Sequence, residues 1–259
     1  TFTTNGPCIL ESVLSQLTAQ ASLLQAVDLH SLSPPLGTAG AAALASVLPL
    51  LPHCVALGLE RNALHSTGMQ ALSAGLCALT GLRSLGLRYN SIRDAGAAVL
   101  ASLLSCLTEL QSLNLGDNEI GATGAAALAQ EICSLRNLQA ISLYNNVLGA
   151  VGAAAFSRVL PLLTSLTYLI VASSQLGDAG AASISSSLQA LTGLRELLIS
   201  SNEVGAAGVT SLCAALASLT SLQKLWIGNP MGAAGAAAFS RVLPLLTSLT
   251  YLSVASSQL

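Results

Sequence analysis

The sequence predicts an α/β solenoid, a curved stack in which parallel strands line the concave face and helices line the convex face. Three observations predict it: a motif that recurs every 28 or 27 residues, an alternating apolar pair in each copy, and a stretch of helical spacing after each pair. Self-similarity at such a period is typical of repeat proteins, in which each unit packs only against its neighbours.

The copies share one pattern, apolar-x-x-apolar-x-apolar-x-x-Asn-x-apolar, followed by small residues and the helical stretch. An irregular copy begins at Leu24. Eight registered copies follow it, beginning at Cys54, Leu82, Leu110, Leu138, Leu166, Leu194, Leu222 and Leu249. Residues 1–259 are therefore predicted to form a single domain of about eight repeats with a partial repeat before them.

Each copy opens with a short strand. In the copy at Leu82, the alternation of Leu85 and Leu87 predicts a strand with one buried face. Asn90 then turns the chain, and its amide can bond backbone groups that the turn leaves open. The equivalent residues predict a ladder through the stack, formed by Asn62, Asn90, Asn118, Asn146 and Asn202.

Three copies depart from the asparagine pattern. Ser174 and Ser257 replace the asparagine, and a deletion shifts Asn229 by one residue. Because the amide is missing or displaced, looser or altered turns are expected at these sites.

Each copy closes with a helix. Residues 96–107 place Leu100, Leu103, Leu104 and Leu107 on one face. Neighbouring helices need about 10 Å, whereas neighbouring strands lie about 4.8 Å apart. The stack must therefore bend with its strands inside.

Both ends of the chain fall within a repeat. The spacing of Leu10, Val13, Leu14 and Leu17 predicts the helix of an incomplete earlier copy. Leu259 follows a strand whose helix is absent, and no polar cap comes after it. We therefore expect the chain to be a fragment of a longer protein.

Composition excludes two classes of partner. Hydrophobic residues make up 53% of the chain and charged residues 8%, but the longest apolar runs, such as residues 39–51, are too short to span a bilayer. A net charge of −2 gives no broad basic surface for nucleic acid. Neither a membrane nor a nucleic acid is expected as a partner.

The cysteines indicate a reducing environment. Cys77, Cys106 and Cys133 recur about one repeat apart near the ends of predicted helices. At the roughly 10 Å spacing of adjacent helices, they are expected to lie too far apart for a disulfide. Since no N-glycosylation sequon occurs either, the sequence predicts a cytoplasmic protein.

No residue pattern indicates catalysis. His30, His53 and His65 occupy unrelated positions in the repeat and have no metal-ligand spacing. No phosphate-binding loop or nucleophile elbow is present. The sequence predicts no enzyme activity, cofactor, metal site or small-molecule substrate.

The polar chemistry collects on the predicted concave face. Five positions in each copy face this side or its rim: two between the first apolar pair, one between the second pair, and two before the asparagine. They hold every tyrosine, the only tryptophan and nine of the twenty charged residues. Enrichment in Tyr, Trp and Arg is typical of binding surfaces, although strand faces also carry such residues for solvation. The candidate partner-binding residues are Glu60, Arg61, Arg83, Arg88, Tyr89, Asp117, Tyr144, Tyr168, Arg195, Glu196, Lys224, Trp226 and Tyr251. Asp28 occupies one of the same positions, and His30, which could reach the rim beside it, is interpreted as a solvated surface histidine.

The motif resembles the ribonuclease-inhibitor type of leucine-rich repeat, and most closely the repeat regions of NOD-like receptors. It is carried by Leu82, Leu85, Leu87, Asn90, Ile92 and Gly96 and their equivalents. The resemblance covers about residues 24–259. It implies a leucine-rich-repeat solenoid that binds another protein on its concave face, with a sensing or autoinhibitory role.

Other functions of such repeats stay open. Similar proteins act as GTPase activators or ubiquitin-ligase substrate adaptors, and Arg61 and Arg88 lie close before a turn, as an inserted arginine requires. A structural or self-associating spacer is a further alternative. A partner with an acidic patch facing Arg61, Arg83 and Arg88 is a specific hypothesis for the binding module.

Overall fold

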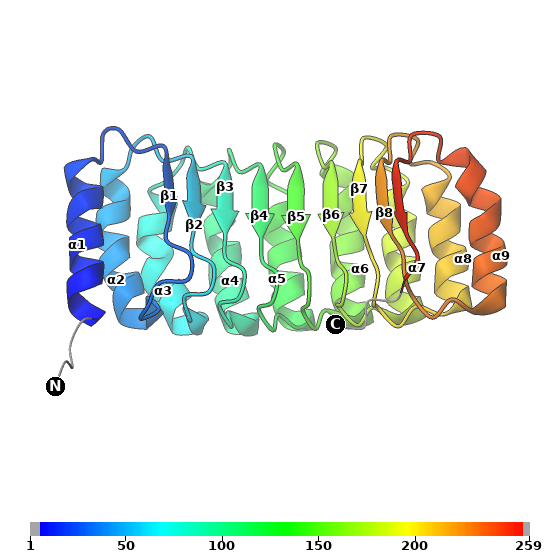
Figure 1. Ribbon diagram of the computed structural model, residues 1–259, viewed down its shortest axis with the longest axis horizontal. Coiled ribbons are helices and arrows are strands. Elements are labelled where there is room, and N and C mark those ends of the chain that lie inside the picture. The colour runs from blue at the N-terminus through cyan, green and yellow to red at the C-terminus, as the bar shows by residue number, and fades with distance from the viewer. Residues whose placement is uncertain (1–5, 256–259) are drawn as a thin grey trace.

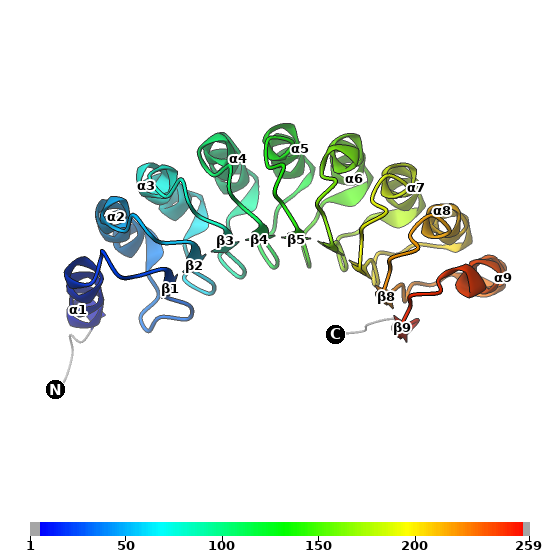
Figure 2. The same ribbon diagram turned by 90° about the horizontal axis from the view of Figure 1, so that it is seen from above.

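The computed structural model describes residues 6–255, which form one curved stack of strands and helices (Figure 1). Seen from above, the strands lie on the inner side of the arc and the helices on its outer side (Figure 2). The nine strands of the described chain form one parallel sheet in sequence order, from β1 to β9. The α/β solenoid predicted from the sequence is confirmed, with the strands on the concave face.

Each strand is three residues long, and its middle residue points into the core. These middle residues pair in exact repeat register, as Leu57 with Leu85 and Leu85 with Leu113. The strands are β1 Ala26–Asp28, β2 Ala56–Gly58, β3 Ser84–Gly86, β4 Ser112–Asn114, β5 Ala140–Ser142, β6 Tyr168–Ile170, β7 Glu196–Leu198, β8 Lys224–Trp226 and β9 Tyr251–Ser253. Since side chains alternate along a strand, the first and third residues face the concave side.

The helices pack side by side over the sheet. Their leucines complete the core, and Leu44, Leu72, Leu100 and Leu128 are fully buried. The helices are α1 Gly6–Ala19, α2 Gly37–Val47, α3 His65–Cys77, α4 Arg93–Leu103, α5 Ala122–Ile132, α6 Gly149–Val159, α7 Gly177–Leu188, α8 Ala206–Leu216 and α9 Gly232–Val242. Short 3₁₀ turns follow four of them: η1 Leu48–Leu50, η2 Leu104–Cys106, η3 Leu160–Leu162 and η4 Leu243–Leu245.

The predicted asparagine ladder is confirmed. Asn90 Nδ2 donates to the carbonyls of Leu59 and Leu87, at 2.9 and 3.0 Å. Its Oδ1 accepts the backbone N–H of Asn62 at 3.0 Å and that of Leu64 at 3.4 Å. Each amide therefore joins a turn to the preceding repeat and satisfies buried backbone groups.

The sites where the sequence departs from the asparagine pattern differ in the hydrogen bonds that they form. Asn229 keeps the ladder despite the deletion: Nδ2 bonds the carbonyl of Ile199, and Oδ1 accepts the N–H of Asn202. The amide bonds are therefore kept, but the turn itself is altered as expected. The residues on either side of Asn229 lack the positive φ found in other repeats, and the Asn229 carbonyl accepts the N–H of Met231 at 2.7 Å. Ser174 bonds the carbonyls of Leu143 and Ala172. Ser257 lies outside the described residues.

The serine at position 174 leaves a gap in the ladder. In the other repeats the asparagine Oδ1 accepts an N–H from the repeat before it. Within the described chain, the N–H groups of Asn146 and Leu148 receive no such acceptor from Ser174. The junction between these two repeats therefore lacks two hydrogen bonds of the ladder, which is the altered turn expected from the sequence.

Two aspartates cap helices of the following repeat. Asp94, near the start of α4, accepts the N–H groups of Gly121 and Gly124 at 2.6 and 3.0 Å. Asp178 does the same for Gly205 and Gly208 at the start of α8. A carboxylate at a helix N-terminus satisfies open N–H groups and interacts favourably with the helix dipole.

Cys77 and Cys106 form a disulfide, so the expectation that they lie too far apart is wrong. Their Cα atoms are 5.3 Å apart. The expected spacing applies to helix axes, but Cys77 ends α3 and Cys106 ends η2. There the chain leaves the helix layer towards the strands, whose spacing of about 4.8 Å draws neighbouring repeats together. Cys54, Cys133 and Cys213 are free thiols.

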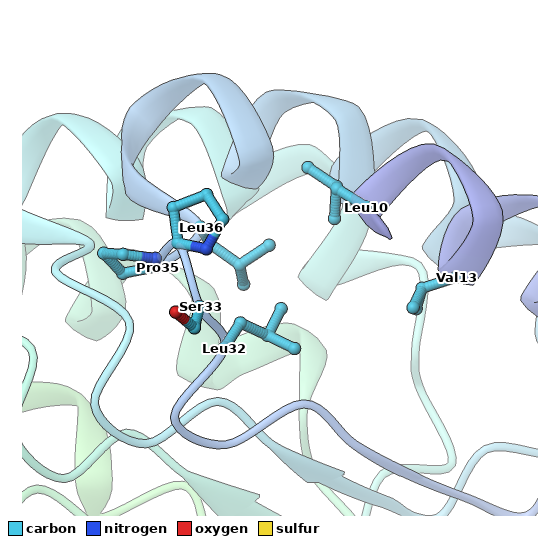
Figure 3. Close-up of a pocket in the computed structure, with 7 residues that line it drawn as sticks. Leu10, Val13, Leu32, Ser33, Pro35 and Leu36 are labelled. Atoms are coloured by element: carbon cyan, nitrogen blue, oxygen red, sulfur yellow. The ribbon is translucent and has the colours of Figure 1, made fainter. Parts of the chain in front are cut away.

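Helix α1 packs on the first repeat, as its leucine spacing predicted. A small cavity of about 40 Å³ remains between Leu10 and Val13 of this helix and the loop from Leu32 to Leu36 (Figure 3). The insertion that carries Pro34 and Pro35 shapes this loop, so the first repeat packs less closely than the later ones.

The helices of the described chain are short compared with the thickness of a bilayer. None of them is long and apolar enough to cross a membrane.

Candidate functional site on the concave face

Three hollows run along the concave face and merge into one groove. Asp28, Glu60 and Gly86 line the first hollow, of about 400 Å³. The second, of about 340 Å³, adds Arg61, Arg88 and Tyr89. The third, of about 300 Å³, reaches Tyr144, Ile170 and Leu198. Asn114 lines all three, so we treat them together as the concave groove.

The turn edge of the groove, where the strands end, holds a closed polar network. Arg88 Nε donates to Asp117 Oδ2 at 2.6 Å, and Asn145 Nδ2 donates to Asp117 Oδ1 at 2.6 Å. The Asp117 side chain is only 3% exposed. Partial burial is the largest single influence on Arg88 and lowers its pKa, but the hydrogen bond and the charge of Asp117, together with Tyr89 and Tyr144, outweigh it and raise the pKa of Arg88.

Aromatic rings extend this network. The guanidinium carbon of Arg88 lies 4.8 Å from the centre of the Tyr89 ring and 5.3 Å from that of Tyr144. Arg61 covers the same Tyr89 ring at 4.3 Å. These cation–π contacts hold both arginines in place. At this edge both arginines therefore already have partners within the chain: Arg88 binds Asp117, and Arg61 contacts the Tyr89 ring.

The predicted arginine cluster does not form a single patch. Arg83 precedes β3 and Arg88 follows it. At about 3.3 Å per residue, the five steps between them separate the two side chains by about 16 Å across the face. Arg83 is exposed on the far edge. An acidic partner patch would therefore meet Arg61 and Arg83 at opposite edges, with Arg88 bound to Asp117.

The C-terminal half of the groove is bulkier. Lys224 Nζ and Glu196 Oε1 are 2.7 Å apart. This bond raises the pKa of Lys224. The rings of Trp226 and Tyr251 lie 4.7 Å apart at an angle of 38°. Tyr168 is exposed at the start of β6, where it pairs in register with Glu196 of β7, and Arg195 is exposed just before β7.

The rim at the first repeat is polar. Asp28 Oδ1 lies 2.8 Å from the Nδ1 atom of the His30 ring, within hydrogen-bond distance. This hydrogen bond holds the pKa of Asp28 below its usual value.

Several residues of the groove carry neither a charge nor an aromatic ring and were not predicted from the sequence. Asn114, Ile170 and Leu198 face the groove as third residues of their strands. The alternation of side chains along each strand is the signal that could have found them.

The described chain offers no evident metal centre. Among residues 10–255, no three His, Cys, Asp or Glu side chains gather as metal ligands would.

Comparison with known proteins identifies the repeat. A leucine-rich-repeat family model matches residues 79–101, 107–129, 163–185 and 191–213. No curated protein matches the sequence significantly.

Two solved structures match this chain, and the one with the higher TM-score has a similar fold. The chain in the TLR13–ssRNA13 complex matches with a TM-score of 0.52 and 16% identity, over 94% of this chain and 34% of that one. This chain thus spans about a third of that protein. An internalin from Listeria monocytogenes matches with a TM-score of 0.39 and 20% identity, over 82% of this chain and 71% of the internalin. The chain therefore carries leucine-rich repeats and folds as a leucine-rich-repeat solenoid.

Proposed function

We propose that this chain is a protein-interaction module that binds another protein in its concave groove. The observation that carries the proposal is the concave face, whose five repeat positions hold every tyrosine, the only tryptophan and nine of the twenty charged residues of the sequence. Tyr89 and Tyr144 line the groove in this face. Aromatic and arginine side chains dominate the energy of protein interfaces. Leucine-rich repeats in general mediate protein–protein contact.

The experiment compares two double variants. Tyr168→Ala with Trp226→Ala removes aromatic area from the concave face, and Val151→Ala with Arg158→Ala truncates two exposed side chains on the convex face as a control. A partner is purified from the source cells, and its affinity for each variant is measured by surface plasmon resonance. The concave-face variant is expected to bind at least about tenfold more weakly. Loss of affinity in the convex variant alone would place the partner on the helices and sink the proposal.

A role like that of a NOD-like receptor repeat region, sensing or autoinhibition, extends this proposal. It rests on the resemblance of the repeat motif. Binding of the chain to other domains of its own full-length protein, competed by a soluble partner, is the result expected of such a role.

Catalysis and nucleic acid binding are weaker interpretations of the same face. A GTPase activator needs a free arginine to reach the nucleotide, whereas Arg88 is bound to Asp117 and Arg61 covers Tyr89. The TLR13 structure is a complex with RNA, but the groove carries acidic and basic side chains together rather than the basic surface that RNA requires. A GTP hydrolysis assay and an RNA filter-binding assay test these alternatives, and both are expected to be negative.

Cytoplasmic location stays a proposal with a direct test. Disulfides persist in oxidising compartments and are reduced in the cytosol. Protein quenched in acid and alkylated before digestion reports the state of Cys77 and Cys106 in the cell. Two alkylated thiols support a cytoplasmic location, and a linked peptide pair indicates an oxidising compartment.

A further inference from the structure

The groove changes character along its length. The third residue of each strand faces its floor, and this column passes from small or polar residues to large apolar ones. From β1 to β9 it reads Asp28, Gly58, Gly86, Asn114, Ser142, Ile170, Leu198, Trp226 and Ser253. The two halves of the groove therefore suit different chemical groups of a partner.

Two carboxylates meet over the glycine floor. Asp28 Oδ1 and Glu60 Oε2 lie 2.8 and 3.1 Å from the point that a Cβ atom on Gly58 would occupy. The Glu60 carboxylate also fills the space above Gly86. Any side chain at either glycine would displace these oxygens. Glycine is unfavourable within a strand, so the two glycines are best explained by the room they leave for the carboxylates.

Other residues of the described chain bind only one of the two carboxylates, that of Asp28. Asp28 bonds His30, but Glu60 forms no ion pair among residues 10–255. No third metal-ligating side chain joins them in that part of the chain. Two carboxylates without a third ligand suit the donor groups of an ammonium or guanidinium better than they suit a metal ion.

The other half of the groove presents an apolar surface. Ile170 and Leu198 line the third hollow and are half-buried. Trp226 follows in the next strand and stacks against Tyr251. Partly exposed aliphatic and aromatic side chains in one row provide the apolar centre that interfaces require.

The distance between the halves sets the spacing of a partner's groups. From β2 to β7 there are five strand steps. At about 4.8 Å each they span about 24 Å, which an extended peptide covers in about seven residues.

We propose that the groove binds a protein segment with a lysine or arginine that enters between Asp28 and Glu60. About seven extended residues away, the same segment places a large apolar side chain on Ile170, Leu198 and Trp226. This inference rests on the proposed function, binding of a protein in the concave groove, and adds the chemistry of the partner. The inference replaces the earlier hypothesis of a partner with an acidic patch by a partner segment that carries a basic and an apolar side chain.

The test uses displayed peptides, because the natural partner is unidentified. Random peptides of about sixteen residues, long enough to cross the groove, are selected on the immobilised chain and sequenced. Three further selections use Asp28→Asn with Glu60→Gln, Ile170→Ser with Leu198→Ser, and the control Glu11→Gln with Glu131→Gln. The control removes the same charge from exposed positions on α1 and α5. Circular dichroism checks that each variant keeps its helices.

The expected result has two separable parts. Peptides selected on the native chain and on the control carry a basic residue and a large apolar residue at the stated spacing. The carboxylate variant binds those peptides at least about tenfold more weakly, and the serine variant loses the apolar preference alone. If the double variant fails to fold, Glu60→Gln carries the same test, since Glu60 has no ion pair in the described chain.

The outcomes also separate this inference from the proposed function. Selected peptides that lack basic residues, or that bind the carboxylate variant unchanged, overturn the inference while groove binding stands. Peptides that ignore both groove variants count against groove binding itself. A selection that yields no peptide above background overturns the inference too.

Discussion

Two repeats of this molecule have nearly the same sequence and very different surroundings. Residues 152–176 and 235–259 differ only at Ile170 and Ser253. Leu169 in β6 is 1% exposed, whereas its counterpart Leu252 in β9 is 36% exposed. Val171 and Val254 differ still more, at 2% and 52%. Burial in a solenoid is therefore supplied by the next repeat rather than by a repeat's own residues.

The largest effect is expected from a matched pair of core truncations. Leu169→Ala leaves a cavity with neighbours on both sides and should cost about 2 to 5 kcal/mol in the free energy of unfolding. Leu252→Ala removes an already exposed side chain and should cost less than about 1 kcal/mol. Urea denaturation followed by circular dichroism measures both. Equal losses would contradict the idea that the neighbour supplies the stability.

Amide hydrogen exchange should separate the same two repeats. The Val171 N–H bonds the carbonyl of Leu198 at 2.9 Å, whereas the Val254 N–H has no backbone acceptor among the described residues. Their intrinsic exchange rates are close because the flanking sequences are almost identical. We expect Val254 to exchange at least about a hundredfold faster, because β9 opens locally. Similar protection of both amides would mean that the outer face of β9 is covered in solution.

Restoring the ladder at position 174 should raise stability. An asparagine there provides the acceptor that the N–H groups of Asn146 and Leu148 lack, and we expect Ser174→Asn to add about 1 kcal/mol. The matched control is Ser174→Ala, which changes the same position without providing an acceptor. A gain in the control as large as that in the ladder variant would show that the missing acceptor is not the cause.

The smallest effect concerns the only difference between the two repeats. Ile170→Ser makes their sequences identical, and loss of a half-buried side chain should cost about 1 kcal/mol or less. Ser253→Ile is expected to change stability by no more than about 0.5 kcal/mol, since β9 has less to pack against. Thermal unfolding of both variants checks this. A clear gain in stability from Ser253→Ile would mean that the ninth repeat packs as the sixth does.

The architecture could be predicted because the fixed spacing of the motif aligns each repeat with the next. Leucines at fixed spacing identify the strands and helices, and Asn90 and its equivalents identify the turns. Contacts between repeats could not be predicted in the same way. Asp94 caps a helix that begins in the following repeat, bonding Gly121 across 27 positions, while rules for helix caps consider only neighbouring residues. The Cys77–Cys106 disulfide was excluded because helix axes were used in place of helix ends.

The candidate site was predicted in outline and missed in detail. The two positions before the asparagine placed Arg88 and Tyr89 at the concave rim, where they line a hollow, and strand alternation placed Trp226 on the concave side of β8. The bond between Arg88 and Asp117 joins residues 29 positions apart and depends on side-chain direction rather than on spacing. The floor of the groove was missed because Gly58 and Gly86 act by leaving space, and an absent side chain gives no chemical signal.

The caps from Asp94 and Asp178 bear on how such a chain can be lengthened or shortened in evolution. Each aspartate accepts hydrogen bonds from glycine N–H groups at the helix start of the following repeat. The two neighbouring repeats must therefore be inherited together if the cap is to be kept. Recombination between them would leave a helix start without its carboxylate and a carboxylate without its amides. The caps lie 84 residues apart, and the nearly identical segments lie 83 apart. Both spacings equal the length of three repeats. A duplication of three consecutive repeats therefore copies each aspartate together with the helix start that it caps.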